Sequence, residues 1–263
     1  MTRLSSLFMG TFVVLVMLFL MAPIVVVVLA SFNAGNFLTF PPQGLSLRWF
    51  WVFLDNEVFR RAIAYSAILA VSATAISLVV GTTAAIYYVR HAGRDRETVN
   101  IGVLLPLILP EILTAIALLF FFYEIGIGTR YYAAILTGHV LMTLPFVFLN
   151  VVTSLQGMDG VTEMAARSLG ASRWTAFRRI TLPLAKPGII SGGLFAFIIS
   201  FDAFAVSFML KGPGTAPLPV QLYDYLRFNF TPEAAAVSTF SILLSVMVII
   251  AADRLVGLRV ERF

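Results

Sequence analysis

The sequence contains no cysteine, and only 12% of its 263 residues are charged. Without cysteine the chain can form no disulfide, zinc–thiolate site or thiol nucleophile. Its two histidines, His91 and His139, stand apart without ligand partners at metal-binding spacing, so no metal site is expected. The phosphate-binding pattern Gly-x-x-x-x-Gly-Lys-Ser/Thr is also missing, which excludes ATP binding by that loop. We therefore expect no cofactor on this chain.

Hydrophobic residues make up 60% of the chain. A water-soluble domain usually carries about 25% charged residues, roughly twice the fraction found here. A surplus of apolar side chains this large indicates lipid as the surrounding solvent. The net charge of +5 does not indicate a nucleic-acid partner, because the charges occupy short gaps between apolar runs and form no basic stripe with interleaved aromatic residues.

Six apolar runs are each long enough to cross a hydrocarbon core of about 30 Å. Because lipid offers no hydrogen-bonding partners, the backbone must form its hydrogen bonds within the segment, so the runs are predicted to be helices. The first run could be a signal peptide, but the apolar part of a signal peptide spans about 7–15 residues, and this run is longer. We expect an all-α protein with a single transmembrane domain over 1–263, and its spans cover about 8–31, 62–89, 99–123, 131–152, 188–210 and 236–257.

Lysine and arginine are distributed unequally between the two sides of this arrangement. If the N-terminus is cytoplasmic, twelve of the 18 basic residues fall on the cytoplasmic side. Basic residues concentrate in cytoplasmic loops of membrane proteins. The pattern predicts that both termini and the long loop 153–187 are cytoplasmic.

The loop 153–187 has the local signals of two short helices joined by a turn. Glu163 suits the first turn of a helix over 162–169, and Gly170 is a typical stop. Ser172 can cap a second helix over 173–181. The prolines that follow are expected to end this helix and to begin the fifth span.

The same loop carries a spaced motif. It resembles that of the inner-membrane permease subunits of binding-protein-dependent ABC importers, which is Glu-Ala-Ala, three residues, Gly, nine residues, Ile, one residue and Leu-Pro. Six positions match at this spacing, namely Ala165, Ala166, Gly170, Ile180, Leu182 and Pro183. Met164 stands where the motif has Glu, and Glu163 lies one place earlier. The departure puts in doubt any ionic contact assigned to the motif's Glu.

The resemblance implies a mechanism and a set of partners. In the family this loop docks on a cytoplasmic ATPase and couples ATP-driven closure to movement of the spans. It implies a bacterial inner-membrane location, a second related permease, two ATPase subunits that hold ATP and Mg²⁺, and a periplasmic substrate-binding protein. The chain itself would be a transport subunit and not an enzyme.

Within the family, the chain resembles the spermidine/putrescine permeases over nearly its whole length. Supporting stretches include Leu109-Pro110-Glu111-Ile112 and Ser200-Phe201-Asp202. Permeases for aminobutyrate, opines, thiamine or ferric iron share parts of these stretches, so another small solute remains the alternative substrate.

Glu111 and Asp202 are acids inside predicted spans. An ionisable residue at the bilayer centre costs about 2.5–3.5 kcal/mol on insertion scales and usually faces a cavity. At 1.5 Å per residue, both acids are expected roughly 18–21 Å from the cytoplasmic start of their spans. Two carboxylates at similar depth could bind an ammonium-bearing substrate, and the resemblance implies this role. The alternative for each acid is a structural hydrogen bond to a neighbouring helix.

Two other classes of function are weaker. Secondary carriers driven by an ion gradient often show two matching halves with interrupted helices, and no such halves are evident. An intramembrane enzyme would need a motif such as Gly-x-Gly-Asp, His-Glu-x-x-His or Gly-x-Ser-x-Gly, and the sequence contains none.

Overall fold

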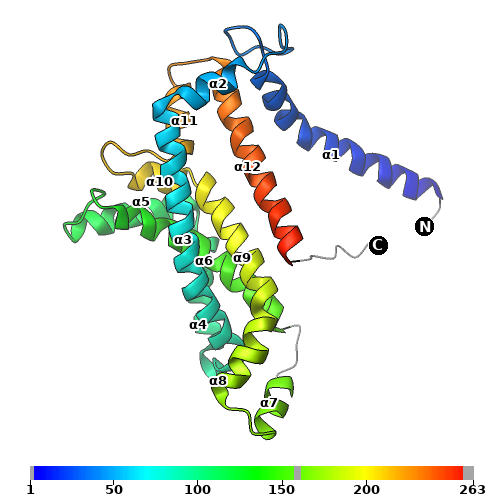
Figure 1. The fold of residues 1–263 in the computed structure, drawn as a ribbon, viewed down its shortest axis with the longest axis vertical. Coiled ribbons are helices and arrows are strands. Elements are labelled where there is room, and N and C mark those ends of the chain that lie inside the picture. Colours follow the sequence, from blue (N-terminus) through cyan, green and yellow to red (C-terminus); the bar gives the residue numbers. More distant parts are fainter. Residues whose placement is uncertain (1–2, 157–160, 257–263) are drawn as a thin grey trace. The chain divides into compact units, whose positions relative to one another are not determined.

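The computed structural model describes residues 3–156 and 161–256, which are mostly helical (Figure 1). Within these residues no strand forms, and the one β-bridge joins Asn33 to Leu45. The elements are α1 (Arg3–Ser31), α2 (Arg48–Asp55), α3 (Glu57–Arg90), η1 (Gly93–Asp95), α4 (Arg96–Ile108), α5 (Glu111–Glu124), α6 (Tyr132–Gln156), α7 (Val161–Ser168), α8 (Arg173–Ala176), η2 (Phe177–Thr181), α9 (Leu182–Asp202), α10 (Ala205–Leu210), α11 (Leu218–Leu226) and α12 (Pro232–Val256).

The described residues contain five unbroken helices that are long and apolar enough to span a membrane. A sixth candidate consists of two helices joined by a bend, and together these account for the six predicted runs. The five unbroken stretches are Leu7–Ser31, Glu57–Arg90, Tyr132–Gln156, Arg173–Asp202 and Pro232–Ala251. The predicted end of the last run, residue 257, lies outside the described residues.

The third predicted span, 99–123, is not one continuous helix. The stretch Gly93–Ile108 and the helix Glu111–Glu124 meet at an angle of 102°. Leu109 is extended, with φ −76° and ψ 141°. The cause is Pro110, because proline has no N–H for the helix and disfavours helical backbone at the residue before it.

The fifth predicted span, 188–210, is also interrupted. Helix α9 ends at Asp202, Ala203 adopts an extended ψ of 109°, and α10 begins at Ala205. At the other end, the expected helix end at the prolines is wrong, since the helix runs on from Arg173 to Asp202. Pro183 lies directly after the π-helical turn η2, where the regular hydrogen-bond pattern of the α-helix is already interrupted, so its missing N–H is tolerated.

The chain forms two compact units, which are described separately. Unit 1 comprises Met1–Arg60 and Leu222–Leu244, and unit 2 comprises Arg61–Gln221 and Ser245–Phe263. In unit 1, Phe53 packs against Phe59 and Phe240 with ring centroids 5.6 and 5.5 Å apart. The buried carboxylate of Glu233 accepts hydrogen bonds from Asn56 Nδ2 at 3.1 Å and from the Tyr225 hydroxyl at 2.8 Å.

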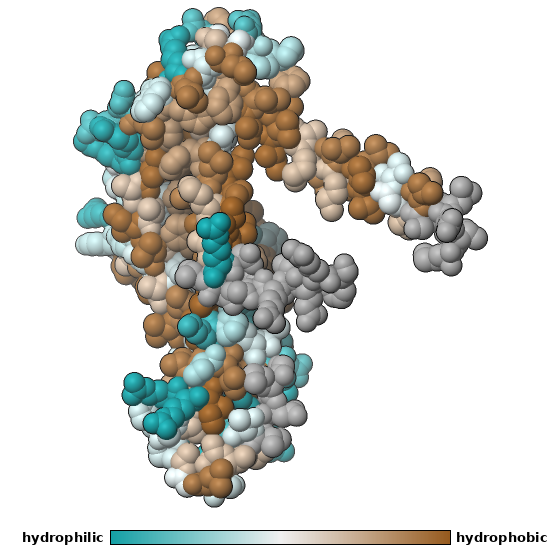
Figure 2. Space-filling view, turned by 45° about the vertical axis from the view of Figure 1, so that its right-hand side comes forward, coloured by the Kyte–Doolittle hydropathy of each residue, from teal (hydrophilic) through white to brown (hydrophobic). Residues whose placement is uncertain are grey.

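Apolar side chains cover much of the surface of the long helices (brown in Figure 2). Helix α1 is the extreme case, because none of the 18 most apolar consecutive residues of Leu7–Ser31 is buried. A helix that is apolar all round is typical of a membrane span or of the core of a larger assembly.

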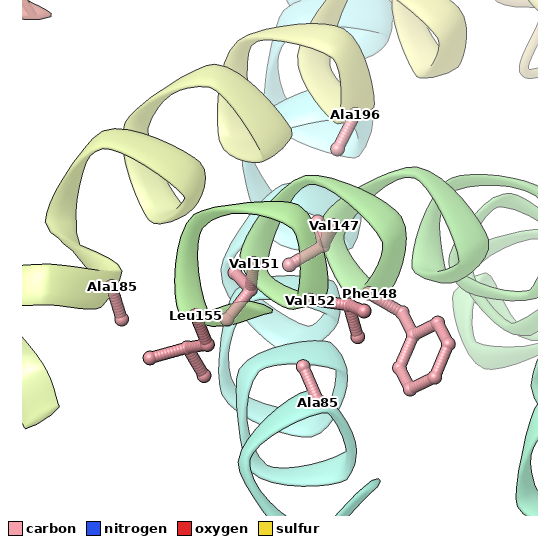
Figure 3. Packing of buried hydrophobic residues seen from close by; sticks show 8 residues of the cluster. All are labelled: Ala85, Val147, Phe148, Val151, Val152, Leu155, Ala185 and Ala196. Carbon is pink, nitrogen blue, oxygen red and sulfur yellow. The ribbon is translucent and has the colours of Figure 1, made fainter. Parts of the chain in front are cut away.

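The core of unit 2 is the packing of α6 against α9 and α3. Figure 3 shows Val147, Phe148, Val151, Val152 and Leu155 of α6 between Ala85 of α3 and Ala185 and Ala196 of α9. Small residues bring the backbones close. A Cβ on Gly192 would lie 2.9 Å from the Val147 Cα, and one on Gly81 would lie 3.0 Å from the Val147 Cβ. A second cluster joins α3, α5, α6 and α10 around Leu69, Ile135 and Leu210.

Candidate transport and coupling sites

Residues 161–181 form a helix–turn–helix, which we call the coupling elbow. Helix α7 ends at Ser168, and Gly170 has φ +93°, a conformation that favours glycine. The Ser172 hydroxyl accepts a hydrogen bond from the Thr175 amide at 3.1 Å and so caps α8. The predicted stop and cap are both confirmed. The first residues of the predicted loop after Gln156, 157–160, lie outside the described residues.

Glu163 points into the protein. Its Oε2 lies 3.4 Å from Arg90 Nε at the end of α3, and the Thr181 hydroxyl donates to the same oxygen at 3.2 Å. The side chains of Arg90 and Glu163 are 15% and 26% exposed. The residue expected to belong to the ATPase-coupling motif therefore makes an ion pair within this chain.

The elbow exposes large apolar side chains. Leu169 is 90% exposed, Trp174 67% and Met164 61%. The other motif residues differ in exposure: Ala165, Gly170, Leu182 and Pro183 are exposed, whereas Ala166 and Ile180 are half-buried. Exposed apolar groups beside charged residues are typical of a protein interaction site.

The structure places Asp202 and Glu111 at the two helix interruptions. Asp202 is the last residue of α9, is exposed, and accepts a hydrogen bond from the Ser245 hydroxyl at 3.4 Å. Glu111 is the first residue of α5, and its Oε1 accepts a hydrogen bond from the Val206 amide at 3.3 Å. Because two helices meet at 102° just before it, Glu111 does not lie on the continuous helix along which its depth was predicted. The contact with Val206 nevertheless brings Glu111 to the interruption that follows Asp202.

His139 spans the interruption between α9 and α10. It is fully buried on α6, with Nδ1 2.8 Å from the Ser200 hydroxyl and Nε2 3.0 Å from the Ser207 hydroxyl. Ser200 precedes the interruption and Ser207 follows it, so one ring holds both helix ends. A buried polar side chain needs such partners, because leaving it unpaired costs free energy.

Sequence reasoning missed His139, Arg90 and Thr181 as contributors to these sites. His139 is isolated in the sequence, and both of its partners lie more than 60 positions away. Arg90 and Thr181 likewise lie far from Glu163 in the sequence, by 73 and 18 positions. Only the position of Pro110 offered a local signal for the bend beside Glu111.

Comparison with known proteins decides the class. Residues 77–262 match the family described as binding-protein-dependent transport system inner membrane component. The chain belongs to this family. It is therefore the transmembrane subunit of an importer, and this assignment disfavours an ion-coupled carrier and an intramembrane enzyme.

Two curated relatives of this permease align over most of its length. It is 30% identical over 244 residues to the spermidine/putrescine transport system permease protein PotC of Escherichia coli, and the alignment covers 93% of this chain and 92% of PotC. It is 32% identical over 228 residues to the putrescine transport system permease protein PotI of the same species, which covers 84% and 80%.

Solved structures share the fold of this permease. A bacterial ABC transporter involved in the import of alginate superposes with a TM-score of 0.74 at 17% identity, over 98% of this chain and 96% of that one. The methionine transporter MetNI, in an inward-facing conformation, gives a TM-score of 0.64 at 19% identity, over 81% and 98%. At these identities the comparison supports the architecture alone.

Proposed function

We propose that this permease forms part of the translocation path for polyamines such as spermidine and putrescine. The observation that carries the proposal is the alignment of 93% of the chain with a permease named for these two solutes. Polyamines carry several ammonium groups, which need acidic or aromatic partners in a path of low dielectric. Asp202 and Glu111 are the acids that we assign to this role.

Asp202 suits direct contact with an ammonium group. It is exposed at the end of α9, and its Oδ2 has a long hydrogen bond of 3.4 Å to the Ser245 hydroxyl. Glu111 uses Oε1 for the Val206 amide. An ionised carboxylate has two oxygens and about four acceptor sites, so this contact leaves capacity for a further donor.

The assembly that we propose has four kinds of subunit. This chain, acting as a single permease domain in a bacterial inner membrane with both termini cytoplasmic, pairs with a second related permease. Two ATPase subunits hold ATP and Mg²⁺ and dock on the coupling elbow, and a periplasmic protein delivers the substrate. The exposed Leu169, Trp174 and Met164 support a docking role, as do the basic residues around them.

The elbow can transmit movement to the path because it continues directly into α9. Residues Arg173–Asp202 form one helical stretch, with the elbow at one end and Asp202 at the other. Alternating access then requires that substrate and nucleotide bind two conformations with different affinity.

The test is uptake of labelled spermidine by the complete complex in proteoliposomes. We expect Asp202→Asn to raise the KM for spermidine about tenfold or more, as for the loss of a charged hydrogen bond, while the complex still assembles. The Glu111→Gln variant should weaken uptake in the same direction. Glu124→Gln is the control, because Glu124 is an exposed acid at the end of α5. Unchanged uptake by Asp202→Asn would contradict the role of this residue in the translocation path. Uptake of another solute but not of spermidine would overturn the assignment of polyamines as the substrate.

A further inference from the structure

The coupling elbow carries an unusual arrangement of charge. Between residues 161 and 181 the only acid is Glu163, whereas four residues are basic, namely Arg167, Arg173, Arg178 and Arg179. All four basic side chains are exposed. The acid alone turns inward, so the elbow presents positive charge to its surroundings and uses its negative charge internally.

The internal contact joins three elements through one atom. Glu163 Oε2 lies 3.4 Å from Arg90 Nε of α3 and accepts a hydrogen bond of 3.2 Å from the Thr181 hydroxyl of η2. Thr181 is 2% exposed, and Arg90 is mostly buried. Glu163 also lies in the first turn of α7 and Arg90 in the last turn of α3, where charges of these signs are favoured by the helix dipoles.

We propose that Arg90 is a positioning residue, and that its ion pair with Glu163 fixes the coupling elbow to α3. The elbow is already continuous with α9 through η2. The ion pair adds a second connection, so that movement imposed on the elbow reaches α3 as well as α9. This inference rests on the proposed docking of the ATPase on the elbow.

Packing within unit 2 supports a common movement of these elements. A Cβ on Gly193 of α9 would lie 3.2 Å from the Leu78 side chain of α3, so the two helices are in contact at this point. If the ion pair is absent, α9 still moves with the elbow, whereas the end of α3 is held only by packing. A partly buried Arg90 without its carboxylate would also carry an uncompensated charge.

The absence of cysteine in the chain makes a direct test simple. Spin labels are placed at Tyr87→Cys on α3 and Thr162→Cys on α7, both exposed positions, in the complete complex. The distance between the labels is measured by EPR without nucleotide and with a non-hydrolysable ATP analogue. We expect one narrow distance, unchanged between the two states, in the parent protein. With Arg90→Ala or Glu163→Gln added, the distribution of distances between the labels should broaden, or its mean should differ between the nucleotide-free and analogue-bound states.

Transport provides the second measurement. Arg90→Ala should lower the spermidine imported per ATP hydrolysed by about two- to fivefold, the effect expected of a partly exposed ion pair. Exposed Arg94 gives the control, because Arg94→Ala removes the same charge on the same side of the membrane. The reversed pair, Arg90→Glu with Glu163→Arg, should recover much of the loss seen in each single variant.

The outcomes separate this inference from the proposed function. An unchanged label distance in Arg90→Ala, or a transport yield equal to that of Arg94→Ala, would overturn the role of Arg90. Failure of the reversed pair to improve on the single variants would do the same. If the parent complex imports no spermidine, the proposed substrate fails, and the EPR distances still decide whether the ion pair fixes the elbow to α3.

Discussion

Gly188 of α9 is the glycine in the described residues at which an added Cβ would meet the tightest contact, and its substitution tests the core of the fold. A Cβ added there would overlap the backbone carbonyl oxygen of Asn150 and would lie 2.6 Å from the Ser154 hydroxyl. The hydroxyl belongs to a side chain that can rotate, but the carbonyl oxygen is part of helix α6. The two helices would therefore have to separate or shift to admit a methyl group.

The cost of Gly188→Ala follows from this geometry. Overpacking a tight core by one methyl group costs about 1–3 kcal/mol. At an unobstructed helical position the same substitution favours the helix by about 1 kcal/mol. Gly102 and Gly10 have nothing within 4 Å of an added Cβ and serve as controls. We thus expect destabilisation at Gly188 and neutral or slightly positive effects at the two controls.

The assay is unfolding of the detergent-solubilised permease in increasing denaturant, followed by loss of helical circular dichroism. Ser154→Ala should not rescue Gly188→Ala, because the obstruction is the Asn150 carbonyl. If Gly188→Ala unfolds at the same denaturant concentration as Gly102→Ala, the close contact of α6 with α9 is wrong.

Two further substitutions probe the elbow and the interrupted helix. Gly170→Asp introduces a side chain at φ +93° and an acid on the basic elbow, and should uncouple ATP hydrolysis from uptake. If the variant imports as much substrate per ATP hydrolysed as the parent protein, the docking of this turn on the ATPase is contradicted. His139→Leu removes the hydrogen-bond partner of the Ser200 and Ser207 hydroxyls and should destabilise the protein by about 1–3 kcal/mol, measured by thermal unfolding. His139→Gln can still donate and accept hydrogen bonds and should recover part of the lost stability. Equal stability of the two variants would contradict a hydrogen-bonding role for His139.

Local sequence was sufficient for the elbow. Gly170 supplies the positive φ at the end of α7, and Ser172 supplies the cap of α8. Both effects act over two or three residues, so no distant contact is needed to predict them. The break before Glu111 was also encoded locally, by Pro110, but hydropathy alone does not detect it because proline does not interrupt an apolar run.

The second interruption could not be predicted in this way. The stretch Phe201-Asp202-Ala203-Phe204 contains neither glycine nor proline, and its apolar character continues into α10. Distant residues stabilise the interruption: Glu111 accepts a hydrogen bond from the freed Val206 amide, and His139 bonds the side-chain hydroxyls of Ser200 and Ser207 on its two sides. A helix can stop inside an apolar run only when such partners are present.

The sequence by itself determined the apolar spans, the elbow and the family, because these depend on composition, short-range backbone preferences and a motif of fixed spacing. The tertiary structure alone decided where α9 ends, what Glu111 contacts and which way Glu163 turns. These three features depend on contacts between side chains of separate helices. Such contacts join residues far apart in the sequence, so local sequence patterns cannot predict them.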